Sequence, residues 1–391
     1  MAFTHIDCFS GPGGFCTGLH AAGFDTRVAI EYIKTCVETY SKNHPNVHVI
    51  HNDIRKVTEE DILPYIPEDG IDLITSGMPC ETFSSAGSTS RSFYDDRQVL
   101  FREAIRIAVF TKAKMILFEN VPEIRTKTIT EDSDELVVDI LKRELETAGY
   151  KNFMETVLAS DDFGVPQARN RYFILACRNG WALTEPTPSS SQNHKTVRDA
   201  FIDLPDVTAN SGVDGTAYRE CNSDYSLLMK NDSFWKREGL FEPALDDHHP
   251  MNHKLSTIKR FSLIEPGENL ATLFEKYDSS TIEKYKQEKI LPKKPFAGRC
   301  YRLLLDKPSR TVTSHCLEEF VHPTSNRALT VRECARLQSF PDSYRFSGPY
   351  SVGHDNRDVQ DRYEQIGDAV PPLLAYAWGL TIKEILENNH E

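Results

Sequence analysis

The chain has 391 residues, of which 39% are apolar and 26% charged, and 58 acidic against 45 basic residues give a net charge of −13. This balance is typical of a soluble globular protein with two or three structural units, and it argues against a chain held on nucleic acid by bulk charge attraction. No run approaches the roughly 18 consecutive apolar residues of a membrane helix, so we expect no membrane contact. The first residues lack a basic region and a cleavage site, so we also expect no secretory signal.

Nine cysteines are spread along the chain without a C-x-x-C pair. A disulfide framework or a zinc ribbon would show paired spacings, so we expect free thiols in the reducing cytoplasm. The nearest candidate for a metal site is the group His248, His249 and His253, which lacks cysteine or carboxylate partners at ligand spacing. We interpret this group as a polar loop and predict no metal.

The first half of the chain alternates short apolar runs with amphipathic stretches. The runs predict strands at 5–9, 26–30, 47–50, 71–75, 115–118, 153–158 and 172–176. The stretches between them predict helices at 15–22, 32–42, 58–65, 100–112 and 136–148. This alternation indicates an α/β fold with a doubly wound, mostly parallel sheet and helices on both faces.

The pattern breaks after residue 181, where a segment rich in proline and serine resembles a linker. We predict a catalytic and cofactor-binding domain at 1–181, a smaller irregular domain at 182–360 and a C-terminal segment, 361–391, that returns to the first domain. Two further helices are expected at 330–339 and 373–386. The window 251–310 holds thirteen basic and seven acidic residues, which fits either a solvated helical face or a surface that follows phosphates.

A glycine-rich turn follows the first predicted strand, with the pattern G-x-G-G-x-x-x-G from Gly11 to Gly18. Glycine permits close approach of the backbone to a ligand, and a helix N-terminus favours an anionic group. A nicotinamide fingerprint would have its third glycine where Cys16 stands. Glu31, at the tip of the second strand, is placed for ribose hydroxyls, and Asp53 for an adenine amine. Together they indicate a nucleoside cofactor.

Reactive groups follow the next two predicted strands. Cys80 ends the segment Gly77-Met78-Pro79-Cys80, and Glu119 follows the neighbouring strand, so both emerge at the edge where open α/β sheets bind ligands. A thiol beside a carboxylate is a candidate for nucleophilic and acid–base chemistry. Farther along, Arg169 and Arg171 alternate with period two and should share one face of a strand. Singly, each residue also fits a buried thiol, a loop acid or an exposed polar strand.

Six sequence blocks resemble, in order, those of DNA (cytosine-5)-methyltransferases of the bacterial restriction–modification type. They are DCFSGPGGFCTGL at 7–19, GMPCETFSSAG at 77–87, FENV at 118–121, QARNR at 167–171, RALTVRECARLQSFPD at 327–342 and QIGDAVPP at 365–372. The resemblance spans nearly the whole chain. It departs at Glu81, where the family usually has Gln, and at Asp368, where it usually has Asn.

The resemblance implies the fold of S-adenosylmethionine-dependent methyltransferases with a target-recognition domain, and S-adenosylmethionine as cofactor. The implied cofactor-binding residues are Phe9, Gly11, Gly13, Gly14, Phe15, Glu31, Tyr32, Asp53, Ile54, Pro79, Leu100, Asp368 and Ala369. It implies Cys80 as nucleophile, Glu119 as the acid that binds cytosine, and Arg169 and Arg171 as supports of the flipped nucleotide. We expect DNA contacts from Ser84, Ser85, Arg299, Arg302 and Arg310.

The implied reaction is methyl transfer to carbon 5 of a flipped-out cytosine in a specific duplex sequence, through a covalent bond between Cys80 and carbon 6. We expect a cytoplasmic, nucleoid-associated monomer that binds double-stranded DNA, with a companion restriction endonuclease acting on the same site. An RNA cytosine-5 methyltransferase of the transfer-RNA type and a catalytically silent DNA-binding scaffold are the alternatives. A nicotinamide oxidoreductase is disfavoured by Cys16.

Overall fold

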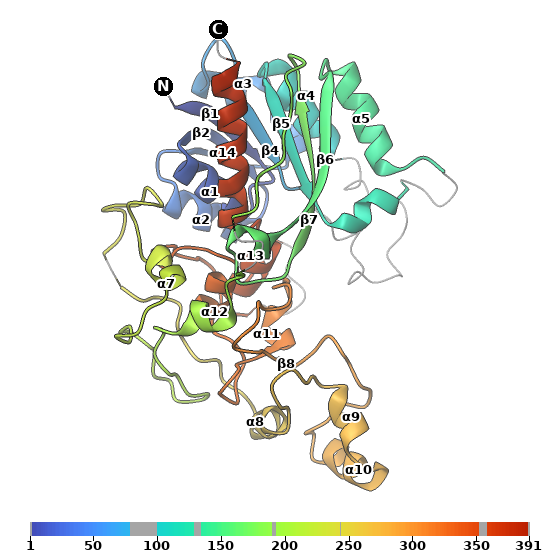
Figure 1. Ribbon diagram of the computed structural model, residues 1–391, viewed down its shortest axis with the longest axis vertical. Helices are drawn as coiled ribbons and strands as arrows, with labels where there is room; N and C mark the ends of the chain where they lie inside the picture. The colour runs from blue at the N-terminus through green and yellow to red at the C-terminus, as the bar shows by residue number, and fades with distance from the viewer. Residues whose placement is uncertain are drawn as a thin grey trace.

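A seven-stranded sheet forms the upper half of the molecule (Figure 1). The computed structural model describes residues 2–78, 100–128, 134–189, 193–242, 244–351 and 358–389. The strands are β1 (Phe3–Cys8), β2 (Phe24–Glu31), β3 (His48–His51), β4 (Leu73–Ser76), β5 (Met115–Asn120), β6 (Asn152–Ala159) and β7 (Asn170–Cys177). Their spatial order is β3-β2-β1-β4-β5-β7-β6.

The five neighbouring strands β3, β2, β1, β4 and β5 are parallel, whereas β7 pairs antiparallel with both β5 and β6. The prediction of a mostly parallel, doubly wound sheet is confirmed. Cys8 is in register with Ser76, and Ser76 with Phe118, so β1, β4 and β5 end side by side. The carboxyl ends of three neighbouring strands therefore meet at one edge, which is where ligands bind in open α/β sheets.

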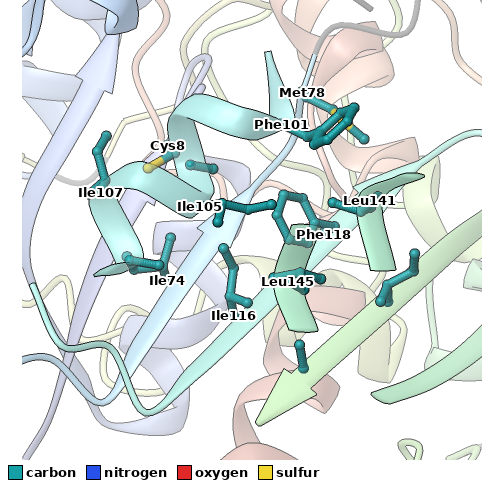
Figure 2. Packing of buried hydrophobic residues seen from close by; sticks show 14 of the residues in the cluster. Cys8, Ile74, Met78, Phe101, Ile105, Ile107, Ile116, Phe118, Leu141 and Leu145 are labelled. Carbon is teal, nitrogen blue, oxygen red and sulfur yellow. The ribbon is translucent and has the colours of Figure 1, made fainter. Parts of the chain in front are cut away.

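Helices cover both faces of the sheet. They are α1 (Gly14–Ala22), α2 (Lys34–Asn43), α3 (Glu59–Ile62), α4 (Phe101–Phe110), α5 (Val137–Thr147) and α14 (Pro372–Asn388). Alternate strand residues point to opposite cores, because side chains in a strand alternate between its two faces. Leu73 packs with α1 and α14, whereas Ile74 packs with α4 and α5. Figure 2 shows the second core, where Phe101 and Ile105 of α4 face Phe118 of β5.

The lower half of the molecule is a second lobe of short helices and loops (Figure 1). Its elements are α6 (Val197–Phe201), α7 (Asp224–Met229), α8 (Leu255–Ser262), α9 (Thr272–Lys276), α10 (Ser279–Gln287), β8 (Tyr301–Arg302), α11 (Cys316–Glu319), β9 (Phe320–Val321), α12 (Val331–Leu337) and α13 (Arg362–Asp368). Sequence periodicity had indicated only α12 among them. Each of these helices has fewer than ten residues, which gives a periodic pattern little length in which to emerge.

The C-terminal segment 361–391 packs against both lobes. Helix α13 packs against α11 and α12 of the second lobe, and Tyr363 and Ile366 lie in that lobe's core. Helix α14 then returns to the sheet and packs along α1, as Figure 1 shows. Among the helices that the structure describes, none is long and apolar enough to cross a membrane.

Candidate active site

The ends of β1, β4 and β5 bring three of the predicted motifs together at Gly77, directly after β4. A methyl group added to Gly77 would lie 3.7 Å from the Phe9 carbonyl oxygen, 3.8 Å from Glu119 Oε2 and 3.9 Å from the Phe15 ring. The glycine turn and the buried carboxylate are thus both in van der Waals reach of the segment that leads to Cys80. The predicted residues Pro79, Cys80, Ser84 and Ser85, together with Glu81, lie outside the described residues.

The glycines of the turn have different roles. Gly11 has a φ of +53°, and no atom of the described residues lies within 4 Å of the position that its Cβ would take. Its surface is therefore open to a ligand. A side chain at Gly13 would meet the Tyr344 hydroxyl at 2.7 Å, and one at Gly14 would overlap the backbone carbonyl of Val370. Close packing inside the protein therefore requires glycine at both Gly13 and Gly14.

Glu31 lies beside the open glycine. One of its carboxylate oxygens accepts the N–H of Gly11, and the other accepts those of Tyr32 and Ile33, each at 2.7 Å. Burial raises the pKa of Glu31, and these three backbone donors oppose that rise. The carboxylate thus fixes the glycine turn on the end of β2, and Oε2, which accepts a single N–H, keeps a lone pair for a further donor. Tyr32 is exposed, and its hydroxyl donates to Asp358.

The remaining predicted cofactor residues of the first lobe lie along the same edge. Asp53 caps the 3₁₀ helix Ile54–Lys56, and its carboxylate accepts from the backbone and the guanidinium of Arg55. Its hydrogen bonds to Arg55 lower the pKa of Asp53, so the side chain is an anion. Ile54 is buried, and Phe9 and Leu100 pack at the rim of the same apolar cluster. A charged acceptor beside an apolar surface suits the amine and ring of a purine.

Glu119 forms an ion pair with Arg171, with 2.8 Å between a carboxylate oxygen and Nε. The two side chains are only 11% and 12% exposed, respectively. Burial raises the pKa of Glu119, and the charges of Arg171 and Arg169 partly offset this rise. A raised pKa favours the protonated carboxyl group, which acid–base chemistry on a ring nitrogen requires.

The two arginines bind different partners, although both of their charges act on Glu119. Arg171 points to Glu119, whereas Arg169 precedes β7 and is 2% exposed. Its guanidinium donates to the carbonyls of Val312, Gly367 and Ala369. Ser160 donates its N–H to the carbonyl of Arg169, so the pairing of β6 and β7 continues to this residue.

The predicted C-terminal residues reach the site through the contact between Gly14 and Val370. Asp368 is exposed and accepts from the side-chain amide of Gln360 at 2.8 Å, whereas Ala369 is buried. The carbonyl of Ala369 accepts from Gln338 Nε2 at 2.7 Å. The sequence interpretation overlooked both Gln338 and Gly77. The only available signal was their position inside two of the motif blocks, since neither carries a reactive group.

Three arginines were predicted to contact DNA, and the structure places them differently. Arg299 is exposed and pairs with Glu318, and Arg310 is exposed and stacks over the Tyr301 ring at 3.7 Å. Arg302 is 5% exposed, and its guanidinium donates to four backbone carbonyls and the Asn326 side chain. Because its charge is enclosed inside the second lobe, Arg302 is removed from the predicted DNA contacts.

The described parts of the chain contain no group of three or more histidine, cysteine or acidic side chains that could hold a metal ion. Every cysteine that the structure describes is a free thiol, and all but Cys221 are buried. The reactive groups that the described residues do assemble are therefore a carboxyl group, an arginine and an open glycine turn.

The sheet order, with a glycine turn after β1, defines the fold of S-adenosylmethionine-dependent methyltransferases. A family model described as C-5 cytosine-specific DNA methylase matches residues 3–384, and the chain belongs to this family. It is 32% identical to the Type II methyltransferase M.DdeI of Desulfomicrobium norvegicum over 98% of this chain and 89% of the relative. It is also 32% identical to M1.HphI of Haemophilus parahaemolyticus, over 96% of this chain and 86% of the relative.

Solved structures share the fold. A putative DNA modification methyltransferase encoded within a prophage of Escherichia coli superposes with a TM-score of 0.70 at 22% identity, over 99% of this chain and all of that one. The Dnmt2 methyltransferase of S. pombe gives a TM-score of 0.52 at 18% identity, over 99% of this chain and 100% of the other. Family membership makes the protein a DNA cytosine-5 methyltransferase.

Proposed function

We propose that this chain transfers a methyl group from S-adenosylmethionine to carbon 5 of a flipped-out cytosine in a specific duplex DNA sequence, with Cys80 as nucleophile. The observation that carries the proposal is the position of Gly77, which lies within 4 Å of both the glycine turn and the Glu119 carboxylate. Cys80 follows Gly77 by three residues. Methyl donor, thiol and base-binding acid would then meet at one sheet edge.

The residues around the glycine turn fit S-adenosylmethionine. Gly11 is open to a ligand, and the buried Ser10 hydroxyl has no hydrogen-bond partner among the residues that the structure describes. Glu31 would accept ribose hydroxyls, Asp53 would accept the adenine amine, and Phe9, Ile54 and Leu100 would enclose the ring. When bound, this cofactor supplies an electrophilic methyl group on a sulfonium sulfur.

Carbon 5 of cytosine is a poor nucleophile, and covalent addition at carbon 6 overcomes this. The Cys80 thiolate would add to carbon 6, which moves electron density onto carbon 5. An electropositive site favours the thiolate, and Arg171 is the nearest described cation to the acid that binds the base. After carbon 5 has gained its methyl group, loss of the proton there and expulsion of the Cys80 thiolate restore the ring.

Glu119 would bind N3 and the exocyclic amine of the cytosine. N3 of neutral cytosine is an acceptor, so Glu119 must donate a proton to it, and the raised pKa of this buried carboxyl supports that role. In the structure, Arg171 forms an ion pair with this carboxyl group. Arrival of the base would exchange part of this ion pair for hydrogen bonds to the ring, while the guanidinium stays close enough to support the nucleotide.

DNA would contact the second lobe. Arg310 is the best placed of the predicted arginines, because its segment runs beside the strand that carries Arg171: Ala168 donates to the carbonyl of Ser309, and Thr311 to that of Ala168. Ser84 and Ser85, which lie outside the described residues, remain predicted DNA contacts. Flipping a base costs a few kcal/mol, which contacts in the pocket must offset. The basic window 251–310 would bind phosphates and make affinity salt-dependent.

The test is a methyl-transfer assay with Cys80→Ser, together with trapping on DNA that contains 5-fluorocytosine. The variant should lose transfer completely, and the unmodified protein should form a covalent complex, because fluorine at carbon 5 blocks the release step. Full activity of Cys80→Ser would overturn the proposal. Arg310→Ala should weaken DNA binding while leaving cofactor binding unchanged.

The same assay with labelled DNA and RNA in competition separates the DNA substrate from a transfer-RNA substrate. We further propose a monomer that works in the cytoplasm on nucleoid DNA, with a companion endonuclease of the same target sequence, as expected for the Type II methyltransferases that the chain resembles. Bisulfite sequencing of DNA from a host that expresses the chain would identify the target. Sedimentation would measure the oligomeric state.

A further inference from the structure

Two buried glutamines and one buried arginine join the sheet to the second lobe. Gln167 accepts from the N–H of Val312 at 2.7 Å and donates to the carbonyl of Leu337 at 3.1 Å. Gln338 donates to the carbonyls of Ile366 and Ala369 at 2.9 and 2.7 Å. The two glutamine side chains also bond to each other. We call Gln167, Gln338 and Arg169 the polar joint.

Arg169 lies at the centre of the polar joint. Its Nη1 donates to the carbonyl of Val312 at 2.5 Å, and its Nη2 donates to the carbonyls of Gly367 and Ala369 at 2.8 and 3.3 Å. The last two carbonyls flank Asp368. Arg169 and Gln338 therefore both hold the backbone of 366–369. The next residue, Val370, packs against Gly14 of the glycine turn.

We propose that Arg169 is a positioning residue for the cofactor and acts through the backbone of 366–369. This inference rests on the proposed binding of S-adenosylmethionine at the glycine turn, and it reassigns Arg169 from the flipped nucleotide to the methyl donor. Gly14 leaves no space for a side chain against Val370, so a displacement of this backbone would move the turn itself. Asp368 and Ala369 would move with it.

The chemistry of the side chain explains why an arginine stands here. A planar guanidinium presents several N–H groups in fixed directions and can bind three carbonyls at once, whereas a lysine ammonium is a flexible point charge. Gln338 repeats the contact to Ala369 without a charge. Loss of either side chain should loosen the same backbone segment, and only loss of Arg169 also removes a cation near Glu119.

Arg169→Lys and Gln338→Ala test the proposal, with Arg302→Lys as the matched control. Arg302 is an equally buried arginine that binds backbone carbonyls, but it lies wholly within the second lobe. Calorimetry without DNA measures the Kd for S-adenosylmethionine, and steady-state assays measure KM for cofactor and for DNA. Thermal melts first establish that each variant is folded.

We expect Arg169→Lys to weaken cofactor binding by about tenfold or more and to raise KM for the cofactor more than KM for DNA. Gln338→Ala should shift both constants in the same direction by a smaller factor, and Arg302→Lys should leave the cofactor Kd unchanged. A normal cofactor Kd for Arg169→Lys with weakened DNA binding would overturn the proposal in favour of a nucleotide contact. Equal losses in Arg169→Lys and Arg302→Lys would overturn it in favour of a purely structural role. Failure of the unmodified protein to bind the cofactor would instead reject the proposed function.

Discussion

The two lobes satisfy their buried backbone groups by different means. In the sheet, neighbouring strands exchange N–H and carbonyl bonds along almost their full length. The second lobe has short helices and long loops, and its carbonyls accept from buried arginine side chains instead. Arg302 binds four carbonyls, and Arg332 binds those of Asp246, Pro341 and Tyr344. A buried backbone group must find a partner, and arginine offers five donors to groups that no strand or helix reaches.

Because buried arginines are part of the interior of the second lobe, a basic residue there can be assigned to DNA only after its burial is known. The buried arginines of this lobe are Arg237, Arg302, Arg327, Arg332, Arg336 and Arg345. Several also bind buried carboxylates, as Arg327 binds Glu333. In the first lobe, the buried carboxylates Glu31 and Glu119 lie at the sheet edge and face the candidate site.

Removal of a buried arginine should test this contrast most severely. Arg336 bonds to both Asp203 and Asp342, and all three side chains are almost completely buried. Arg336→Met would leave two buried carboxylates without their shared cation, which typically costs about 3–5 kcal/mol. Urea unfolding measures the loss.

Arg198→Met is the control, because Arg198 forms an exposed pair with Asp306 and should contribute less than about 1 kcal/mol. Equal losses in the two variants would show that buried arginines do not hold the second lobe together.

Two glycine variants should separate packing from ligand binding in the first lobe. Gly14→Ala would overlap the Val370 carbonyl and should destabilise the protein by about 3 kcal/mol, since a packed backbone cannot yield easily. Gly11→Ala places its methyl group in open space, so it should cost only the 1–2 kcal/mol or so of a left-handed residue while weakening cofactor binding. Thermal melts and cofactor titrations distinguish them. A Gly11→Ala protein with normal cofactor affinity would contradict the assignment of the open glycine.

Asp7 offers a test of a buried charge within the sheet. It accepts from Thr75 and Tyr40, and burial raises its pKa to about 7, with a smaller contribution from the charge of Glu31. Because the pKa of Asp7 is higher in the folded state than in the unfolded state, the contribution of Asp7 to stability is greatest at low pH. This contribution falls as the pH rises towards 7. Between pH 5 and pH 7 this group should remove about 2 kcal/mol.

Asp7→Asn should abolish that part of the pH dependence. Urea unfolding of both proteins at pH 5 and pH 7 measures it, and the difference between the two proteins isolates Asp7 from the other buried acids. Identical slopes in the two proteins would show that Asp7 does not ionise in this range.

The smallest expected effect is at Asp368, where the sequence departs from its family. Its charge lies near those of Glu31 and Glu364, since all three carboxylates act on the buried Cys36 thiol. Asp368→Asn keeps an acceptor for Gln360 and removes one negative charge from the set of predicted cofactor-binding residues. We expect cofactor binding to tighten by a few-fold at low salt. Unchanged or weaker binding would place Asp368 away from the cofactor carboxylate.

Local sequence patterns were sufficient for the sheet and the order of the motifs. Each strand from β1 to β7 was predicted to within a few residues, because an apolar run between turn residues is a local signal. Both Glu31 and Glu119 were expected at strand ends, and they lie there. The glycine turn, the cofactor class and the family followed from motifs that are contiguous in the chain.

The orientation of the other residues depends on contacts between segments that are far apart in the chain. Arg302 and Arg310 belong to one basic segment of the sequence. Arg302 is buried and binds backbone carbonyls, whereas Arg310 lies exposed over the ring of Tyr301. Gly14 and Arg169 meet partners about 200 to 350 residues away in the chain, at Val370 and Ala369. Such long-range contacts depend on how the C-terminal segment docks between the lobes, and no local pattern of hydrophobicity or charge encodes that docking.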